Sequence, residues 1–509
     1  MHPDDQRKLN LGIIIFLPFI CWLTAVQKTE VLTGHKLVAL WEIMKITHTK
    51  PILWGSALGG LAVAIFFVWL ITSFGNGEFG GAPFRKFLRG TKIVSASSLR
   101  RKTKEKQPQV ELATIPMPVR LETFHTLLNG ATGSGKSVAL RALAYSILKR
   151  NIVAGDRVVF IDPNADMLTK FYREGDVILN PYDSRTKGWS IFNEIRKDYD
   201  FQRYAYSVVP LGETKEAEEW ASYGRLLLRE TMKKLHMMGK PSMREVFHWT
   251  TIASFDDLRE FLEGTLAESL FAGSNEASKA LTSARFVLSD KLPEHVTMPS
   301  GDFSIRDWLE NSKGNMFITW REDMGAALRP LISAFADVIC TSVLSMEPDS
   351  KRAIWLQIDE LASLEKLASL EDALTKGRKH GLRVVAGLQS TSQLDDKYGQ
   401  HAAQTIRANF RNLVVLGGSR PDPKTSEDMS LSLGEHEVER DKHSRSSGKH
   451  SSTNKSPERN RERVVIPAEI ANLPELTAYV ALAGNYPIAK VKLEYMNFAD
   501  RVPAFVEGL

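Results

Sequence analysis

A glycine-rich octapeptide carries the strongest chemical signal in this 509-residue sequence. It begins at Gly130, ends at Ser137 and fits the pattern G-x-x-x-x-G-K-[ST] at every fixed position. In this pattern the glycines let backbone N–H groups turn towards phosphate, the lysine reaches the β- and γ-phosphates, and the hydroxyl ligates Mg²⁺. ATP and Mg²⁺ are therefore the expected cofactors. The predicted nucleotide-binding residues are Gly130, Ala131, Thr132, Gly133, Ser134, Gly135, Lys136, Ser137 and Val138.

The residues around the octapeptide have the patterns that a phosphate-binding loop requires. Residues 123–129 are typical of a short strand, and residues 138–149 carry apolar side chains at helical spacing. A helix that begins at the loop adds a partial positive charge next to the bound phosphates. A chance glycine-rich turn would have neither the strand nor the helix, so we interpret the segment as a P-loop.

Two apolar runs that end in carboxylates are candidates for the acid that orients the metal. One run ends at Asp162, and the other ends at Asp359 and Glu360. Both runs are typical of buried strands. The acid pair provides one carboxylate for the Mg²⁺ shell and one to polarise the attacking water, so we predict Asp359 as metal ligand and Glu360 as general base. Asp162 is predicted to cap its turn, because Pro163 and Asn164 follow it.

A third predicted strand, residues 382–388, ends next to a polar side chain. A glutamine at this position, Gln389, can sense the γ-phosphate or orient water if the strand lies beside the P-loop. The alternative is that this segment only begins a helix, with Ser390 or Thr391 as the N-cap. We predict the sensing role for Gln389.

A basic turn, residues 376–380, lies between the last two of these strands. Arg378 in this turn is a candidate arginine finger that reaches the phosphate of a neighbouring subunit. The alternative is a solvated helix end, where basic side chains interact favourably with the helix dipole. The sequence leaves both interpretations open.

The order of predicted elements indicates an α/β fold in which one ATPase domain is interrupted. Strands alternate with helices over residues 123–183, and they do so again from about residue 314 to residue 416. Residues 184–300 have helical periodicity and few β-rich runs. We therefore predict a nucleotide-binding domain over 123–183 and 301–509, and an all-α domain over 184–300. Residues 464–509 are expected to add a closing strand or two.

Within the predicted all-α domain, three apolar residues fall on one face of a helix. They are Trp220, Tyr223 and Leu227, at spacings of three and four residues. This spacing is more typical of a helical core face than of a platform on which bases stack. We expect all three side chains to lie in the core.

Two apolar runs near the N-terminus predict a pair of membrane-spanning helices. They cover residues 9–26 and 51–72, each close to the ~20 residues that cross a bilayer. Residues 1–74 are thus a predicted membrane anchor with a short periplasmic loop. Glycines at positions 55, 59 and 60 permit close contact between the two helices.

The charges that flank the two spans predict which side of the membrane each end occupies. Residues 85–106 hold nine Lys or Arg and one Glu, whereas the loop between the spans holds four Lys and two Glu. The positive-inside rule then predicts that the N-terminus and the large domain of this multi-pass membrane protein lie in the cytoplasm. Residues 75–122 are predicted to be a basic juxtamembrane segment.

The overall composition limits the partners and excludes several kinds of site. A net charge of +6 favours an anionic partner, either nucleic acid or a lipid surface. The two cysteines have no metal-ligand spacing, so they do not indicate a zinc site or a disulfide framework. Residues 436–463 are basic and poor in apolar side chains, which predicts a flexible loop that either contacts nucleic acid or is only solvated.

Several long sequence blocks resemble those of the type IV coupling proteins of bacterial conjugation. They include GATGSGKS, FIDPNADML, IDELASLEKLASL and LGGSRPDPKT, and their order matches that family. The resemblance implies a RecA-like fold, assembled as a homo-hexamer around a channel, that hydrolyses ATP in a DNA-dependent manner. It also implies that single-stranded plasmid DNA and attached relaxase move to a type IV secretion channel, with relaxosome accessory proteins as partners.

By motif position, the resemblance also implies roles for individual residues. Lys136 and Ser137 correspond to the Walker A motif, and Asp359 and Glu360 to the Walker B motif. Gln389 corresponds to the family's motif glutamine, and Arg378 to its arginine finger. Two other functions stay open: a docking receptor in which nucleotide controls assembly, and a chromosome-segregation DNA translocase, although no winged-helix pattern stands out.

Overall fold

The chain folds into two compact units in the computed structural model. One unit combines Met1–Gly90 with Glu435–Glu462, and the other combines Thr91–Gly434 with Arg463–Leu509. The structure describes residues 3–28, 44–45, 47–75, 84–154, 157–212, 214–271, 275–349, 351–446 and 452–507. Most of the predicted periplasmic loop and the middle of the predicted basic loop lie outside the described residues.

The first unit contains two apolar helices, α1 (Pro3–Lys28) and α3 (Pro51–Gly75), each long and apolar enough to cross a membrane. The two helices pack closely at Gly60, where a Cβ atom would lie 2.8 Å from the Cα of Pro18 and 2.9 Å from the Cβ of Cys21. A side chain at this position would separate the helices. The expected glycine-mediated contact is thus confirmed at Gly60, whereas the other two glycines of the pattern have no neighbour within 4 Å.

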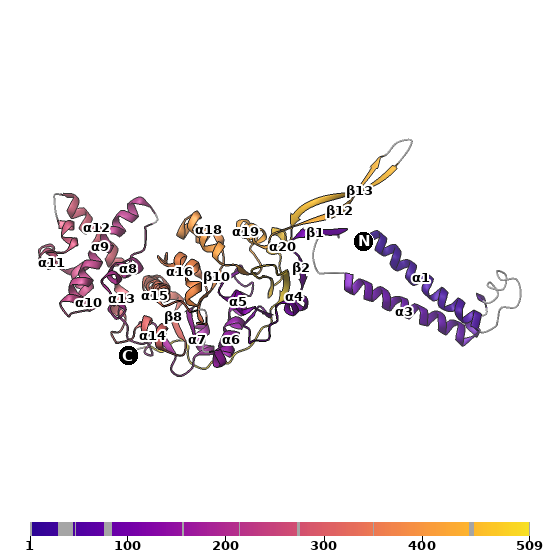
Figure 1. Cartoon of the computed structure of the whole chain (residues 1–509), viewed down its shortest axis with the longest axis horizontal. Coiled ribbons are helices and arrows are strands. Elements are labelled where there is room, and N and C mark those ends of the chain that lie inside the picture. Colours follow the sequence, from indigo (N-terminus) through magenta and orange to yellow (C-terminus); the bar gives the residue numbers. More distant parts are fainter. Residues whose placement is uncertain are drawn as a thin grey trace. The chain divides into compact units, whose positions relative to one another are not determined.

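The first unit also contains a three-stranded sheet with the order β1-β12-β13. Its strands are β1 (Lys86–Gly90), β12 (Glu435–Ser446) and β13 (Ser452–Arg463). Strand β1 pairs with β12 in antiparallel orientation. The prediction of a flexible loop over 436–463 is therefore wrong for the strand residues, which form two long arms of this sheet (Figure 1).

Charge pairing explains why this polar segment is ordered. Acidic side chains of one strand form ion pairs with basic side chains of the neighbouring strand. Val438 of β12 is fully buried and lies opposite Phe87 of β1, which adds one apolar contact. The sequence prediction considered only the low apolar content, whereas ladder hydrogen bonds and cross-strand pairs also stabilise a sheet. The ion pairs are Arg85–Glu439, Arg89–Glu437, Arg440–Glu462 and Arg461–Glu435.

The second unit is built on a ten-stranded sheet, and within the described residues only β14 runs against the direction of the other strands. The strand that precedes the P-loop, β5, lies in the interior of the sheet between β11 and β10. In spatial order the strands are β2 (Ile93–Ser95), β15 (Ile488–Lys492), β14 (Thr477–Ala481), β11 (Asn412–Val415), β5 (Thr126–Asn129), β10 (Leu382–Leu388), β9 (Ile354–Ile358), β6 (Arg157–Pro163), β8 (Met316–Trp320) and β7 (Val177–Leu179).

Helices pack around this sheet, and they include a third long apolar helix, α15 (Gly325–Ser345). Since 83% of the apolar window of α15 is buried inside the protein, this helix is part of the core. The other elements near the sheet are α4 (Ala96–Thr103), β3 (Glu111–Leu112), β4 (Ile115–Pro116), α5 (Val119–Glu122), α6 (Lys136–Ala154), α7 (Asp166–Phe171), α14 (Ile305–Asn311), α16 (Leu370–Lys376), α17 (Thr391–Tyr398), α18 (Gln400–Asn409), α19 (Pro423–Leu433) and α20 (Pro467–Ala471).

The predicted strands agree with the structure, but the nucleotide-binding domain begins earlier than predicted. Strand β2 pairs with β15, and Leu99, Leu112 and Ile115 are fully buried in the core around α6. Much of the predicted juxtamembrane segment 75–122 is thus part of the domain. Its many basic residues concealed the apolar positions that pack inward. The predicted closing strands of the C-terminal segment are β14 and β15.

The insertion predicted at 184–300 is helical, and its described residues contain no strand longer than an isolated bridge at Trp189. Its longest helix, α9, carries Leu227 fully buried, but Trp220 is 46% exposed. The expectation that all three residues lie in the core is therefore wrong for Trp220, while Tyr223 is partly buried and packs against the core. The helices are α8 (Asp198–Val208), α9 (Lys215–Met237), α10 (Met243–Phe247), α11 (Phe255–Leu262), α12 (Asn275–Lys291) and α13 (Pro293–Thr297).

Candidate active site

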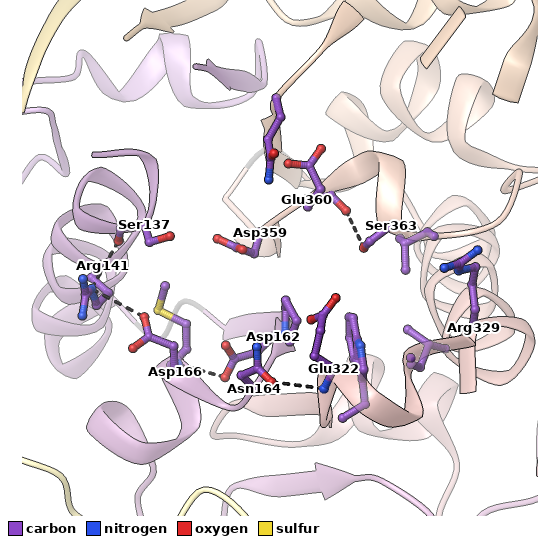
Figure 2. A pocket seen from close by; sticks show the side chains of 17 residues that line it. Ser137, Arg141, Asp162, Asn164, Asp166, Glu322, Arg329, Asp359, Glu360 and Ser363 are labelled. Carbon is purple, nitrogen blue, oxygen red and sulfur yellow. Dashed lines mark hydrogen bonds and ion pairs between the residues drawn. The ribbon is translucent and has the colours of Figure 1, made fainter. Parts of the chain in front are cut away.

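Four parallel strands bring the predicted site residues to one edge of the sheet. Strand β5 pairs with β10, β10 pairs with β9, and β9 pairs with β6, all in parallel register. The residues that follow these strands therefore emerge side by side at their carboxyl ends. They surround a cavity of about 460 Å³ (Figure 2). Its lining includes Ser137, Asp162, Asp359, Glu360 and Gln389.

The P-loop between β5 and α6 is held by backbone contacts that only glycine allows. Gly130 N–H donates to the carbonyl of Leu388, 3.1 Å away, and a Cβ on Gly130 would lie 2.7 Å from the Cβ of Leu416. Gly133 and Gly135 have φ angles of +81° and +107°, which lie in the region that favours glycine. The loop thus has the close-packed backbone that the sequence pattern predicts, and α6 begins at Lys136.

Lys136 connects the P-loop to the acid pair after β9. Its Nζ lies 2.5 Å from Oε2 of Glu360, and the side chains are 8% and 14% exposed. The other carboxylate oxygen of Glu360, Oε1, is buried and has no hydrogen-bond partner in the described part of the chain. A buried acceptor without a partner is costly, so this oxygen is available to a ligand or to water.

Asp359 lies beside this pair at the end of β9. Burial raises the pKa of Asp359, while the nearby Lys136 acts in the opposite direction and Glu360 raises it further. The backbone is tightly packed here, since a Cβ on Gly387 of β10 would lie 1.9 Å from the carbonyl oxygen of Asp359. A glycine in the neighbouring strand therefore allows the acid pair to lie close to the P-loop.

Asp162 at the end of β6 has the predicted capping role. Its Oδ2 accepts hydrogen bonds from the backbone N–H groups of Met167 and Leu168, both at 2.9 Å, at the start of α7. Burial raises the pKa of Asp162 to about 7, although both hydrogen bonds act to lower it. Asp162, the candidate metal-orienting acid that the sequence analysis assigned to the cap instead, also lines the cavity.

Gln389 contacts the P-loop directly. Its Oε1 accepts a hydrogen bond of 3.0 Å from Oγ1 of Thr132. The alternative role as a helix start lacks a side-chain cap, because the hydroxyl of Ser390 donates to Asp422 and that of Thr391 donates to Asp428. Because of this hydrogen bond, a conformational change of the P-loop at Thr132 would also move the side chain of Gln389.

Arg378 does not join these residues in the same chain. It lies in the short turn Gly377–His380, just before the amino end of β10, so it is at the opposite edge of the sheet. Its guanidinium carbon is 4.0 Å from the ring centroid of Phe124, and that of Arg411 is 4.5 Å from the same ring. Within its own chain, Arg378 is exposed and contacts the ring of Phe124.

The structure adds cavity residues that the sequence reasoning missed. Arg141 forms an ion pair of 3.5 Å with Asp166, which lies in the first turn of α7. Helical spacing was the available signal for Arg141, because it follows Ser137 by four residues on α6. The additional lining residues include Arg141, Asn164, Asp166, Glu322, Arg329 and Ser363 (Figure 2).

A known protein family matches most of the sequence. Residues 109–494 match the family model described as the type IV secretion-system coupling protein DNA-binding domain. The chain belongs to the type IV coupling protein family. It is 30% identical to the coupling protein TraD of Escherichia coli strain K12 over 431 residues, which cover 79% of this chain and 57% of TraD. The chain therefore spans little more than half the length of that relative.

Other relatives and solved structures belong to the same group. Over 197 residues, 38% of this chain and 30% of the relative, the chain is 26% identical to the conjugal transfer protein TraG of Agrobacterium fabrum strain C58. The structure of the unbound bacterial conjugative coupling protein TrwBdeltaN70 matches with 73% identity and a TM-score of 0.80, covering 85% of this chain and 98% of that one.

A structure of TrwB in complex with ADP and Mg²⁺ matches with 73% identity and a TM-score of 0.79. It covers 85% of this chain and 100% of that one. At this identity the fold is shared, so the second unit has a RecA-like P-loop fold with an inserted all-α domain, preceded in the chain by two apolar helices.

Proposed function

We propose that this chain is a membrane-anchored, DNA-dependent ATPase that couples the relaxosome to a type IV secretion channel and pumps single-stranded plasmid DNA during conjugation. One observation carries the enzymatic part. A single cavity is lined by Ser137, Asp359, Glu360 and Gln389, and Lys136 enters the same cluster through its ion pair with Glu360. The family membership supports the conjugative role, because relatives are named as coupling and conjugal transfer proteins.

The residues present fit ATP and Mg²⁺. The hydroxyl of Ser137 and the carboxylate of Asp359 are hard oxygen donors of the kind that Mg²⁺ prefers, and both line the cavity. The P-loop backbone has the glycine geometry that cradles phosphates. TrwB has been solved with ADP and Mg²⁺ and with a non-hydrolysable ATP analogue. We assign Gly130 to Val138 to nucleotide binding, and Ser137 and Asp359 to the metal.

The remaining residues serve the transfer of the γ-phosphate to water. Lys136 leaves its ion pair with Glu360 and binds the phosphate oxygens, which frees the Glu360 carboxylate. Glu360 then orients the attacking water and accepts its proton. Gln389 responds to the γ-phosphate through Thr132, the P-loop residue with which it shares a hydrogen bond. Mg²⁺, when bound, neutralises charge that develops on the phosphate oxygens.

Arg378 acts in trans in this proposal, within a homo-hexamer. Its position supports this role, because it is remote from the P-loop of its own chain and near the surface edge of the sheet. Mixing Arg378→Ala protein with Lys136→Thr protein tests the assignment. Mixed rings bring an intact finger against an intact P-loop, so turnover should exceed that of either variant alone. No recovery at any mixing ratio would contradict the trans finger.

The membrane part of the proposal rests on the two N-terminal helices and on flanking charge. Helices α1 and α3 are proposed to span the inner membrane, with the N-terminus and the second unit in the cytoplasm. There the second unit would meet relaxase, relaxosome accessory proteins and channel proteins. The test of this topology is cysteine labelling from the periplasm, in which a cysteine in the loop between the spans should react and one in the second unit should not.

ATP turnover by the full-length protein in detergent tests the enzymatic proposal. Turnover should rise when single-stranded DNA is added, and Lys136→Thr should abolish it, because the lysine binds the transferred phosphate. If the rate of ATP turnover does not change when single-stranded DNA is added, the result would contradict the proposed DNA-translocating function. If conjugation still required such a protein, the docking-receptor function would replace the pump. Retained turnover in Lys136→Thr would show that the measured activity belongs to a contaminant.

A further inference from the structure

Asp162 is a second carboxylate beside the proposed metal ligand. Strands β6 and β9 are parallel, and Ile161 pairs with Ile358, so the next residues, Asp162 and Asp359, leave adjacent strand ends. Neighbouring strands are about 4.8 Å apart. The backbone N–H of Asp359 donates to the carbonyl of Ile161, which holds the two ends together. Figure 2 shows both carboxylates at the same cavity.

The two oxygens of Asp162 have different environments. Oδ2 accepts both N–H groups at the start of α7, so it performs the capping role alone. Both side-chain hydrogen bonds that Asp162 accepts within the described residues go to Oδ2, and the residue, which is 2% exposed, lines the cavity. The capping role therefore uses only one oxygen of the carboxylate, and the other oxygen remains for a ligand in the cavity.

A structural role alone does not account for the charge. Asparagine caps a helix about as well as aspartate, and it would avoid the cost of a buried anion next to another acid. Asp359 follows the neighbouring strand and Asp166 lines the same cavity, so the nearest charged neighbours of Asp162 include two further acids. Two basic side chains of the site are paired with other acids: Lys136 with Glu360, and Arg141 with Asp166. Asp162 itself forms no ion pair within the described residues, so a bound cation would supply the positive charge that this carboxylate lacks.

We propose that Asp162 is a further residue of the nucleotide site, whose free oxygen accepts a hydrogen bond from a water molecule bound to Mg²⁺. This inference rests on the proposed metal roles of Ser137 and Asp359. Mg²⁺ is usually held by one or two protein oxygens and retains several of its waters. Groups that hydrogen-bond to the metal's ligands contribute ~10–100-fold to metal affinity. Asp162 is thus a positioning residue, and through the same side chain it connects the metal to α7.

The full-length protein with Asp162→Asn tests the proposal. Asparagine keeps a carbonyl oxygen for the two N–H groups of α7, but it presents an NH₂ group to the cavity, which cannot accept from water. The affinity for fluorescent ADP is measured in EDTA and over a Mg²⁺ titration. We expect unchanged affinity and melting temperature in EDTA, and a ~10–100-fold higher Mg²⁺ concentration at half-saturation. Asp162→Ser, which removes the charge and keeps a capping hydroxyl, should shift the Mg²⁺ titration similarly.

Two controls separate this inference from the proposed function. Asp166→Asn removes an acid from the same cavity, but that acid is paired with Arg141 and Lys170, so the Mg²⁺ titration should move less than threefold. Asp359→Asn should shift the titration at least as far as Asp162→Asn. If Asp359→Asn has no effect, the metal assignment itself fails. If it has an effect and Asp162→Asn behaves like wild type, only the role of Asp162 is overturned. Loss of ADP binding in EDTA by Asp162→Asn would also overturn it, because that result indicates a purely structural residue.

Discussion

Buried charged side chains have different surroundings at the two ends of the strands in the large sheet, which we call its amino edge and its carboxyl edge. At the amino edge, Glu122 is completely buried and is paired with Arg150 and Arg383 at 2.5 and 3.0 Å. Nearby, Asn412 donates to two backbone carbonyls and accepts from a backbone N–H. At the carboxyl ends of the strands, Glu360 Oε1 is buried without a described partner, and Asp162 lines the same cavity with only one of its two oxygens in described hydrogen bonds.

This difference separates charges that hold the fold from charges that bind a ligand. A buried charge network with every atom paired rigidifies the structure and needs nothing from outside. A buried carboxylate with an unpaired oxygen costs stability unless something else completes it. The carboxyl edge bears this cost at the place where the P-loop lies. Substitutions at the carboxyl edge should therefore mainly lower catalysis, whereas substitutions at the amino edge should mainly lower stability.

Glu360→Gln should produce the largest effect, and the effect should be on catalysis. Removing the proposed base should lower ATP turnover by ~10²–10⁴-fold. ADP affinity should stay equal or rise, because Lys136 no longer leaves a carboxylate to reach phosphate. Steady-state turnover and equilibrium nucleotide binding measure the two quantities. Turnover close to that of wild type would show that Glu360 is not the base.

Glu122→Gln should mainly affect stability. Its removal leaves Arg150 and Arg383 buried with an uncompensated charge, and breaking such a buried pair costs about 3–5 kcal/mol. Chemical unfolding measures this loss, while turnover per folded molecule should hardly change. Asp372→Asn is a matched control, since its pair with Lys376 is exposed and should contribute less than about 1 kcal/mol. An equal effect of the two substitutions would contradict the distinction between the edges.

His295 in the all-α domain sharpens the comparison, because it is a buried unpaired group far from the P-loop in the sequence. Neither ring nitrogen has a hydrogen-bond partner within the described residues, and burial lowers the pKa of His295 from 6.5 to about 4. Between these pH values the unfolded chain binds a proton that the folded chain excludes. Folded stability should therefore fall as the pH decreases from 6.5 towards 4.

His295→Phe should remove this pH dependence. The unfolding free energy of the variant relative to wild type should rise by about 3 kcal/mol between pH 7 and pH 4. Denaturant titrations followed by tryptophan fluorescence measure the difference, and the exposed His401, changed to Gln, is the control. A constant difference across this pH range would indicate that a ligand or ordered water compensates His295, as at the carboxyl edge of the sheet.

The sequence predicted the chemistry well where it depends on local pattern. The P-loop and the strand that ends at Asp359 and Glu360 follow from residues that are adjacent in the chain, whereas the contact of Gln389 with Thr132 depends on the pairing of β10 with β5. Predictions failed where distant partners decide the outcome. Trp220 has core spacing on α9, yet it is 46% exposed. The basic segment that includes Val438 forms strands because cross-strand acids neutralise it.

By itself, the sequence determined that this protein has a phosphate-binding loop, an acid pair on a buried strand, an all-α insertion and two apolar helices. These properties depend on glycine conformation, helical and strand periodicity, and the length of apolar runs. Only the tertiary structure decided that Asp162 shares a cavity with Asp359 and that Arg378 lies away from its own P-loop. Sheet order brings β6 beside β9, and no local pattern encodes which strands become neighbours.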